Sequence, residues 1–308
     1  MSASTMENAA PAGLVNRDMD EAEVVYVGVR KGYWAAVFER LSRDPITLVC
    51  AAVVIAIVLV SVFAPWIAPH DPYKTSMLKR LVPVGSPGHL LGTDELGRDM
   101  LTRLMYGGRV SMFTAIAPVV LALLIGGTLG IIAGFVGGHV NMLIMRITDI
   151  FYAFPSILLA IAISGALGGG ITNAILSLTL IFIPPICRVA ETVTTQVRNL
   201  DYVAAARATP ASTMRIVRVH VLGNVFGPIL VYASSLVSVS IIVASGLSFL
   251  GLGVSPPEAD WGLMLNTLRQ SIYVAPVNSA LPGAMIFVTG ICFNLMSDGL
   301  RAAMDVKL

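Results

Sequence analysis

The chain has 308 residues, of which 56% are hydrophobic and only 12% are charged, and its mean hydropathy is +0.81. Soluble domains carry about 25% charged residues, so this composition excludes an ordinary soluble domain. The formal net charge of +2 excludes a nucleic-acid-binding polycation and an acidic disordered chain. The three cysteines are odd in number, far apart and inside apolar stretches, which excludes a disulfide framework or a zinc site built from them. The sequence predicts a membrane protein.

Residues 1–44 are predicted to form a cytoplasmic tail that precedes a transmembrane domain at 45–308. The tail is not expected to be a cleaved signal peptide, because 44 polar or amphipathic residues precede the first apolar run. Four apolar residues at helical spacing predict an amphipathic helix within it: Trp34, Val37, Phe38 and Leu41. Two interpretations fit this helix, one on the inner leaflet and one against the protein itself. Asp44 and Pro45 then supply a cap and a first-turn proline for the first span.

Long intervals without charged residues predict the membrane spans. A helix needs about 20 apolar residues to cross the hydrocarbon core. The interval from Asp149 to Arg188 is too long for one span, and glycines between Gly165 and Gly170 divide it into two spans joined by a turn. We therefore expect an all-α membrane protein with six transmembrane helices, at about 46–68, 111–136, 142–165, 171–189, 221–250 and 279–300.

The basic residues predict the orientation of these six spans. The segments on the side of the two termini carry twelve Lys and Arg residues, including those of a loop at 190–220, and the opposite loops carry seven. Basic residues are enriched in cytoplasmic loops, so the N- and C-termini are both predicted to be cytoplasmic.

Small residues recur every fourth position in the second predicted span. Such a ladder lets a neighbouring helix approach to backbone contact in lipid. The ladder fits the core of a translocation bundle and equally fits generic helix packing. Its members are Gly126, Gly130, Gly134 and Gly138.

Ionisable side chains near the spans do not form a catalytic pattern. Arg146 and Asp149 are three residues apart at the end of the third predicted span, where they are expected to neutralise each other. The only Lys followed by Ser or Thr is Lys74, which lacks the glycine of a Walker A loop. The four histidines lie near predicted interfaces and are interpreted as solvated. We expect a non-enzymatic chain with no catalytic residue, no metal and no bound cofactor.

The loop after the fourth predicted span is the most informative segment. It begins with a helix of small residues from which Tyr202 and Arg207 project, and Thr209-Pro210 is predicted to cap a second helix. A low-profile helix of this kind fits the groove of another protein, although a plain surface loop is an equally good interpretation of the spacing. The candidate contact residues are Tyr202, Ala204, Ala205, Ala206, Arg207, Ala208, Thr209, Pro210 and Arg215.

This loop resembles the EAA loop of ABC-importer permeases, and more specifically that of the C-type permease subunits of dipeptide, oligopeptide and nickel importers. Three further segments are similar to the same family, in order: Leu91–Asp99 (LGTDELGRD), Leu247–Val254 (LSFLGLGV) and Phe293–Arg301 (FNLMSDGLR). The chain departs from the family pattern at Ala204, where the EAA glutamate is usual, and at Pro210, where a glycine is usual.

The resemblance implies a type I ABC importer permease fold in the bacterial inner membrane. It further implies a homologous second permease subunit, one or two ABC ATPase subunits that bind ATP and Mg, and an extracytoplasmic solute-binding protein. Transport would proceed by alternating access, with the loop at 190–220 as the coupling loop. The substrate could be a dipeptide, an oligopeptide, nickel or a related solute. The alternative is an ion-coupled secondary transporter, which the charge-free spans and the lack of an internal repeat disfavour.

Overall fold

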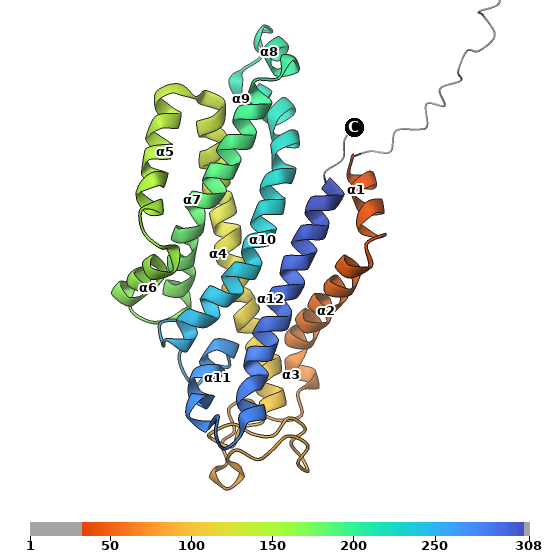
Figure 1. The fold of residues 1–308 in the computed structure, drawn as a ribbon, viewed down its shortest axis with the longest axis vertical. Helices are drawn as coiled ribbons and strands as arrows, with labels where there is room; N and C mark the ends of the chain where they lie inside the picture. Colours follow the sequence, from red (N-terminus) through yellow and green to blue (C-terminus); the bar gives the residue numbers. More distant parts are fainter. Residues whose placement is uncertain (1–32, 305–308) are drawn as a thin grey trace, which may run out of the picture.

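The computed structural model describes residues 33–304, in which α-helices joined by shorter connections make up most of the chain (Figure 1). The elements are α1 (Tyr33–Leu41), α2 (Pro45–Val62), α3 (Ala64–Ile67), the 3-10 turn η1 (Met77–Lys79), α4 (Met100–Val136), α5 (Gly138–Tyr152), α6 (Ser156–Leu167), α7 (Ile171–Arg198), α8 (Asp201–Arg207), α9 (Thr213–Ile216), the π-helical turn η2 (Val217–Val221), α10 (Leu222–Phe249), α11 (Trp261–Leu268), the 3-10 turn η3 (Arg269–Ser271) and α12 (Pro276–Met304).

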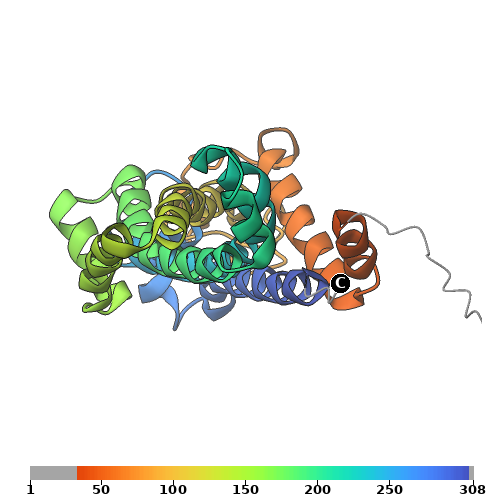
Figure 2. The same cartoon turned by 90° about the horizontal axis from the view of Figure 1, so that it is seen from above.

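Five helical segments within residues 33–304 are long and apolar enough to cross a membrane, and the bent pair α5–α6 is a sixth candidate if it forms one broken span. The expected all-helical membrane fold is confirmed, with five to six candidate spans. One end of the bundle carries α8, and the other carries α11 and the loop between α3 and α4 (Figure 1). We call these the α8 end and the α11 end. Viewed from above, α5 and α6 lie on one side of the bundle and α1 and α2 on the other (Figure 2).

The first span begins where the sequence predicts, but its helix ends before the predicted boundary at about residue 68. Asp44 caps α2 by accepting a hydrogen bond from the Ile46 amide at 3.2 Å, and Pro45 occupies the first turn. The helix ends at Val62, and the short helix α3 follows after Phe63.

In α1, Val37 is only 3% exposed whereas Phe38 is 70% exposed. Since α1 contacts α12, the first helix packs against the protein and leaves Phe38 uncovered.

Helices α4 and α7 extend beyond their predicted spans, which were 111–136 and 171–189. Helix α4 begins at Met100, where the Asp99 carboxylate accepts a hydrogen bond from the Thr102 amide at 2.9 Å. Helix α7 continues to Arg198, so the predicted loop at 190–220 is reduced to the connection at 199–212. The predictions stopped at Arg109 and Arg188, but both residues lie inside the helices; Arg188 pairs with Asp149 of α5, and Arg109 is exposed.

The third predicted span, 142–165, is not one straight helix. It is divided into α5 and α6, which are bent by 85° at a short break. Pro155 lies in this break, has no backbone N–H to donate and restricts the residue before it, so a continuous helix is disfavoured there. As a result of this bend, residues on both sides of the break line a cavity together with residues of α7 and α10.

Two apolar clusters hold the bundle together. The larger joins α4, α6, α7 and α10 and reaches into the α8–α9 connection through Val203 and Ile216. The smaller joins α2, α4, α11 and α12, with Ile241 of α10, around Trp261, whose side chain is completely buried. Helices α4 and α10 take part in both clusters and link the two halves.

Candidate functional site

Helix α8 projects from one end of the bundle and presents small side chains (Figure 1). Val203 is fully buried and anchors the helix, while Ala204 and Ala205 are exposed. Ala206 is half-buried and packs against the larger apolar cluster of the chain itself. The four candidate alanines are therefore not equivalent, and Ala205 is the better measure of an external contact than Ala206.

The turn between α8 and α9 is built differently from the sequence prediction. Thr209 and Pro210 do not cap a second helix, because Thr209 Oγ1 donates a hydrogen bond back to the Ala206 carbonyl at 2.7 Å. The cap is Ser212, whose Oγ accepts from the Arg215 amide at 3.4 Å, and α9 begins at Thr213. Ala208 is the C-terminal cap of α8. The sequence predicted that Thr209-Pro210 caps the second helix, whereas Ser212, two residues after Pro210, is the cap.

A cavity of about 410 Å³ lies between α8, α9 and the π-helical turn η2. It brings together most of the predicted contact residues and excludes Ala204, Arg207, Ala208 and Pro210. Its polar and small lining residues are Tyr202, Ala205, Ala206, Thr209, Arg215 and His220. A partner helix of modest width could insert here, since exposed small side chains leave the space open.

Two contacts connect this loop to the spans. Asn224 in α10 donates to the Tyr202 hydroxyl at 2.9 Å, which ties α8 to the continuous helical segment Thr213–Phe249. The Arg207 guanidinium lies 4.7 Å from the centre of the Phe135 ring at the end of α4, a cation–π contact. A displacement of α8 therefore acts on α4 and α10 directly.

Three of the four ladder glycines lie against α7. A Cβ atom added at Gly126 would lie 2.6 Å from the Ile183 carbonyl oxygen, one at Gly130 2.3 Å from the Cys187 carbonyl oxygen, and one at Gly134 2.6 Å from the Glu191 carbonyl oxygen. The backbones of α4 and α7 thus approach as closely as glycine allows.

Gly138 does not belong to this ladder. Helix α4 ends at Val136, Gly137 has a φ of 72°, and Gly138 begins α5 with a φ of 54° and open space around it. In the sequence the four-residue spacing of glycines continues past the end of α4, but the backbone turns there. Gly138 therefore forms part of this turn and does not pack against α7.

Charges inside the spans pair between helices. Asp149 does not pair with Arg146 as expected; it pairs with Arg188 of α7, whose guanidinium also lies 5.1 Å from the centre of the Tyr152 ring. Farther along α7, Glu191 accepts from the side-chain amide of Asn141 at 2.7 Å. These pairs connect α5 to α7, which could not be found from spacing within one helix.

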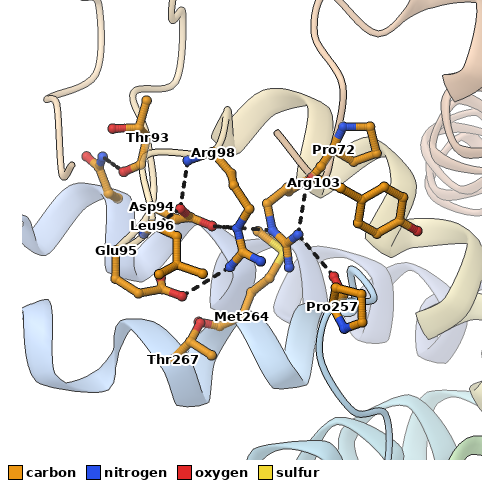
Figure 3. Close-up of polar contacts among 12 residues, drawn as sticks. Pro72, Thr93, Asp94, Glu95, Leu96, Arg98, Arg103, Pro257, Met264 and Thr267 are labelled. Atoms are coloured by element: carbon orange, nitrogen blue, oxygen red, sulfur yellow. Dashed lines mark hydrogen bonds and ion pairs between the residues drawn. The ribbon is translucent and has the colours of Figure 1, made fainter. Parts of the chain in front are cut away.

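The α11 end holds a buried network of charges before and within the start of α4 (Figure 3). The Arg98 Nε donates to Asp94 at 2.6 Å, and Arg103 donates to the carbonyls of Pro72 and Glu258 at 3.1 and 3.2 Å. Burial, followed by the charge of Asp94, raises the pKa of Glu95. The network locks the loop after α3 to the loop before α11.

Beside this network, His89 and Asp99 form a second connected pair. Asp99 Oδ1 lies 2.9 Å from His89 Nδ1 and 3.6 Å from His70 Nδ1. The ligand atoms of these three residues lie within 4.8 Å of one another. However, Lys79 Nζ lies 3.4 Å from His89 Nε2, so both ring nitrogens of His89 already have partners and a cation is close by. The arrangement fits a hydrogen-bonded cap of α4 better than a metal site.

The chain is similar to known membrane transport proteins. The profile of the binding-protein-dependent transport system inner membrane component matches residues 126–308, and that of the N-terminal TM domain of oligopeptide transport permease C matches residues 32–83. A di/tripeptide transport system permease protein of Pseudomonas aeruginosa is 38% identical over 298 residues, which cover 95% of this chain and 97% of the relative. A glutathione transport system permease protein of Pectobacterium atrosepticum is 36% identical, covering 89% and 91%.

A probable D,D-dipeptide transport system permease protein of Escherichia coli is 37% identical and covers 87% of this chain and 89% of its own length. Among solved structures, the inward-facing MetNI methionine ABC transporter aligns with a TM-score of 0.55 and 17% identity, covering 66% of this chain and 97% of the matched chain. At that identity the likeness shows the fold alone.

Proposed function

The chain belongs to the family of binding-protein-dependent transport system inner membrane components, and from this premise we propose that it imports short peptides. Family membership makes it a non-catalytic, multi-pass inner-membrane permease subunit that works with an ATPase and a solute-binding protein. The ion-coupled alternative is thereby set aside. Chains 36–38% identical over most of this sequence are named for di/tripeptides, glutathione and D,D-dipeptides, which supports a substrate of two or three residues.

We further propose the orientation and the assembly. The α8 end faces the cytoplasm together with both termini, and the α11 end receives the binding protein. A second, homologous permease subunit completes the translocation path, and one or two ATPase subunits bind ATP and Mg below α8. The count of twelve basic residues against seven supports this orientation. The buried pairing of Arg98 and Arg103 with acids and carbonyls strengthens it, because two of the seven are no longer free charges.

The observation that carries the coupling proposal is the exposed small-residue surface of α8 beside its 410 Å³ cavity. An ATPase surface that enters this cavity would move Tyr202 and Arg207 together. Their contacts with Asn224 and Phe135 would pass the movement to α10 and α4. A ligand shifts a conformational equilibrium only through contacts that differ between states, and these contacts are suited to differ.

The test compares Ala205→Glu with Ala204→Glu in the intact complex. Both alanines are exposed on α8, but only Ala205 lines the cavity. Overpacking a fitted site costs about 1–3 kcal/mol, and burying an unpaired charge costs more. We expect Ala205→Glu to lower co-purification of the ATPase and ATP-driven uptake at normal permease abundance. Ala204→Glu, which restores the glutamate usual in the resembled loop, should leave both unchanged. Equal behaviour of the two variants would remove α8 as the ATPase contact.

A further inference from the structure

A second cavity, of about 490 Å³, opens at the α11 end between α4, the start of α7 and the loop before α11. We propose, resting on the peptide-import function above, that it holds the two charged termini of a short peptide, with Arg109 binding the carboxylate and Glu258 the ammonium group. We call it the Arg109 cavity. Its principal lining residues are Tyr73, Tyr106, Arg109, Phe113, Ile171 and Glu258.

The Arg109 cavity holds charge that is available for a ligand. The neighbouring Arg98 and Arg103 are buried and engaged by acids and backbone carbonyls. Arg109, in contrast, is exposed, and its guanidinium has no ion pair or hydrogen bond within the described residues 33–304. An arginine fork binds a carboxylate through two parallel hydrogen bonds, so this is the group that Arg109 is suited to receive.

An acidic side chain, Glu258, also lines the Arg109 cavity. Glu258 is exposed, and one of its carboxylate oxygens accepts a hydrogen bond from the Tyr73 hydroxyl at 3.1 Å. Burial, followed by this hydrogen bond, raises the pKa of Tyr73, so the hydroxyl stays a donor to Glu258. The second carboxylate oxygen remains for an ammonium group. A cavity with one free cation and one anchored anion matches a zwitterion.

Hydrogen bonds fix the walls of the Arg109 cavity. The backbone carbonyl of Glu258 accepts from Arg103 at 3.2 Å. The next residues are fixed to α4, because the Asp260 carboxylate accepts from the Ser111 hydroxyl at 2.6 Å and the Trp261 indole donates to the Leu104 carbonyl at 2.9 Å. Both walls are thus held in place before a ligand arrives, which reduces the ordering that binding requires.

The ammonium and carboxylate termini are the groups that all linear peptides share, whereas their side chains vary. The volume lies within the usual range for small-ligand sites, about 300–1,000 Å³. Tyr73, Tyr106 and Phe113 add aromatic surface that can contact different side chains without demanding one of them. The cavity therefore selects for short length and free termini rather than for sequence.

The experiment measures ATP-driven uptake in proteoliposomes that contain the complete importer and its binding protein. Three forms of one dipeptide are compared: free termini, C-terminal amide and N-acetyl. The affinity of the isolated binding protein for each form is measured separately and is the same for every permease variant. The variants are Arg109→Gln and Glu258→Gln, and the control is Arg269→Gln, an exposed arginine at the same end but outside the cavity.

Charged hydrogen bonds of this kind change binding by about tenfold or more. Arg109→Gln should raise the KM for the free dipeptide about tenfold and leave the KM for the amide unchanged. Glu258→Gln should act in the same way on the free dipeptide and spare the N-acetyl form. Arg269→Gln should change none of these values.

Two results would overturn the inference, and they differ. If the wild-type importer takes up no peptide, both the proposed function and the assignment of the Arg109 cavity are wrong. If the wild type imports peptides but Arg109→Gln and Glu258→Gln leave all values unchanged, or lower uptake of all three forms equally, the residues act structurally or not at all. In that case peptide import stands and the assignment of the Arg109 cavity is wrong.

Discussion

The contact between α4 and α7 can be tested with a single methyl group at Gly130. A Cβ there would lie 2.3 Å from the Cys187 carbonyl oxygen, 2.6 Å from the Ala190 Cβ and 2.9 Å from the Glu191 amide nitrogen. None of these atoms is the end of a flexible side chain, and ordinary contact begins at 3.4 Å. The two helices must therefore separate by about 1 Å. Overpacking of this kind costs about 1–3 kcal/mol.

Gly127 supplies the matched control. It lies on the same helix and is also buried, but an added Cβ meets only the Leu123 side chain, at 3.7 Å. Alanine is favoured over glycine inside a helix by about 1 kcal/mol, so Gly127→Ala should melt at or above the wild-type temperature. Gly130→Ala gains the same helix propensity and should still melt below Gly127→Ala. Thermal unfolding in detergent, followed by the fluorescence of the buried Trp261, measures both. Gly130→Ala melting as high as Gly127→Ala would refute close packing at this point.

Three further predictions address the ends of the bundle and the nucleotide. Desolvation raises the pKa of Asp99, but hydrogen bonds from His89 and Thr102 outweigh it and hold the pKa below its usual value. Stability should therefore be lost as pH falls through the lowered pKa, and Asp99→Asn should flatten this loss in melts at different pH. In a background without other cysteines, a cysteine at the 95%-exposed Tyr273 should react with an impermeant thiol reagent in intact cells, and one at the 74%-exposed Met214 should react only after permeabilisation; the reverse pattern would invert the orientation. The purified subunit should show no saturable ATP binding in equilibrium dialysis, because its sequence lacks a phosphate-binding loop.

The sequence was sufficient to predict the helical class and the positions of the apolar segments, because charge-free intervals report directly on lengths that can cross a membrane. It placed the ends of α4 and α7 wrongly for a definite reason. The charged residues Arg109 and Arg188 were treated as boundaries, yet both lie inside helices, α4 and α7. Arg109 lines a cavity, and Arg188 pairs with Asp149. A charged residue therefore need not end a helix, and a partner that is distant in sequence leaves no local pattern.

The candidate loop shows the same limit at finer scale. Its position, its small residues and the involvement of Tyr202 and Arg215 could be found from the sequence, whereas the half-burial of Ala206 and the Ser212 cap could not. The Arg109 cavity was not predicted at all. Its charged residues, Arg109 and Glu258, are far apart in the chain and meet only because the loop before α11 packs on α4.

The helical segment Thr213–Phe249 crosses the molecule without interruption. At 1.5 Å per residue, its 37 residues make a rod of about 55 Å. A tilt of roughly 10° about the middle of such a rod would carry each tip about 5 Å in opposite directions. At one tip is the loop that we assign to the ATPase. The other tip leads into Leu252 and Gly253, whose carbonyls accept hydrogen bonds from the Ser164 hydroxyl in α6 and from the Gly170 amide in the turn between α6 and α7. The segment would then pivot as one rigid body, so that opening at one face of the membrane and closing at the other are the same motion.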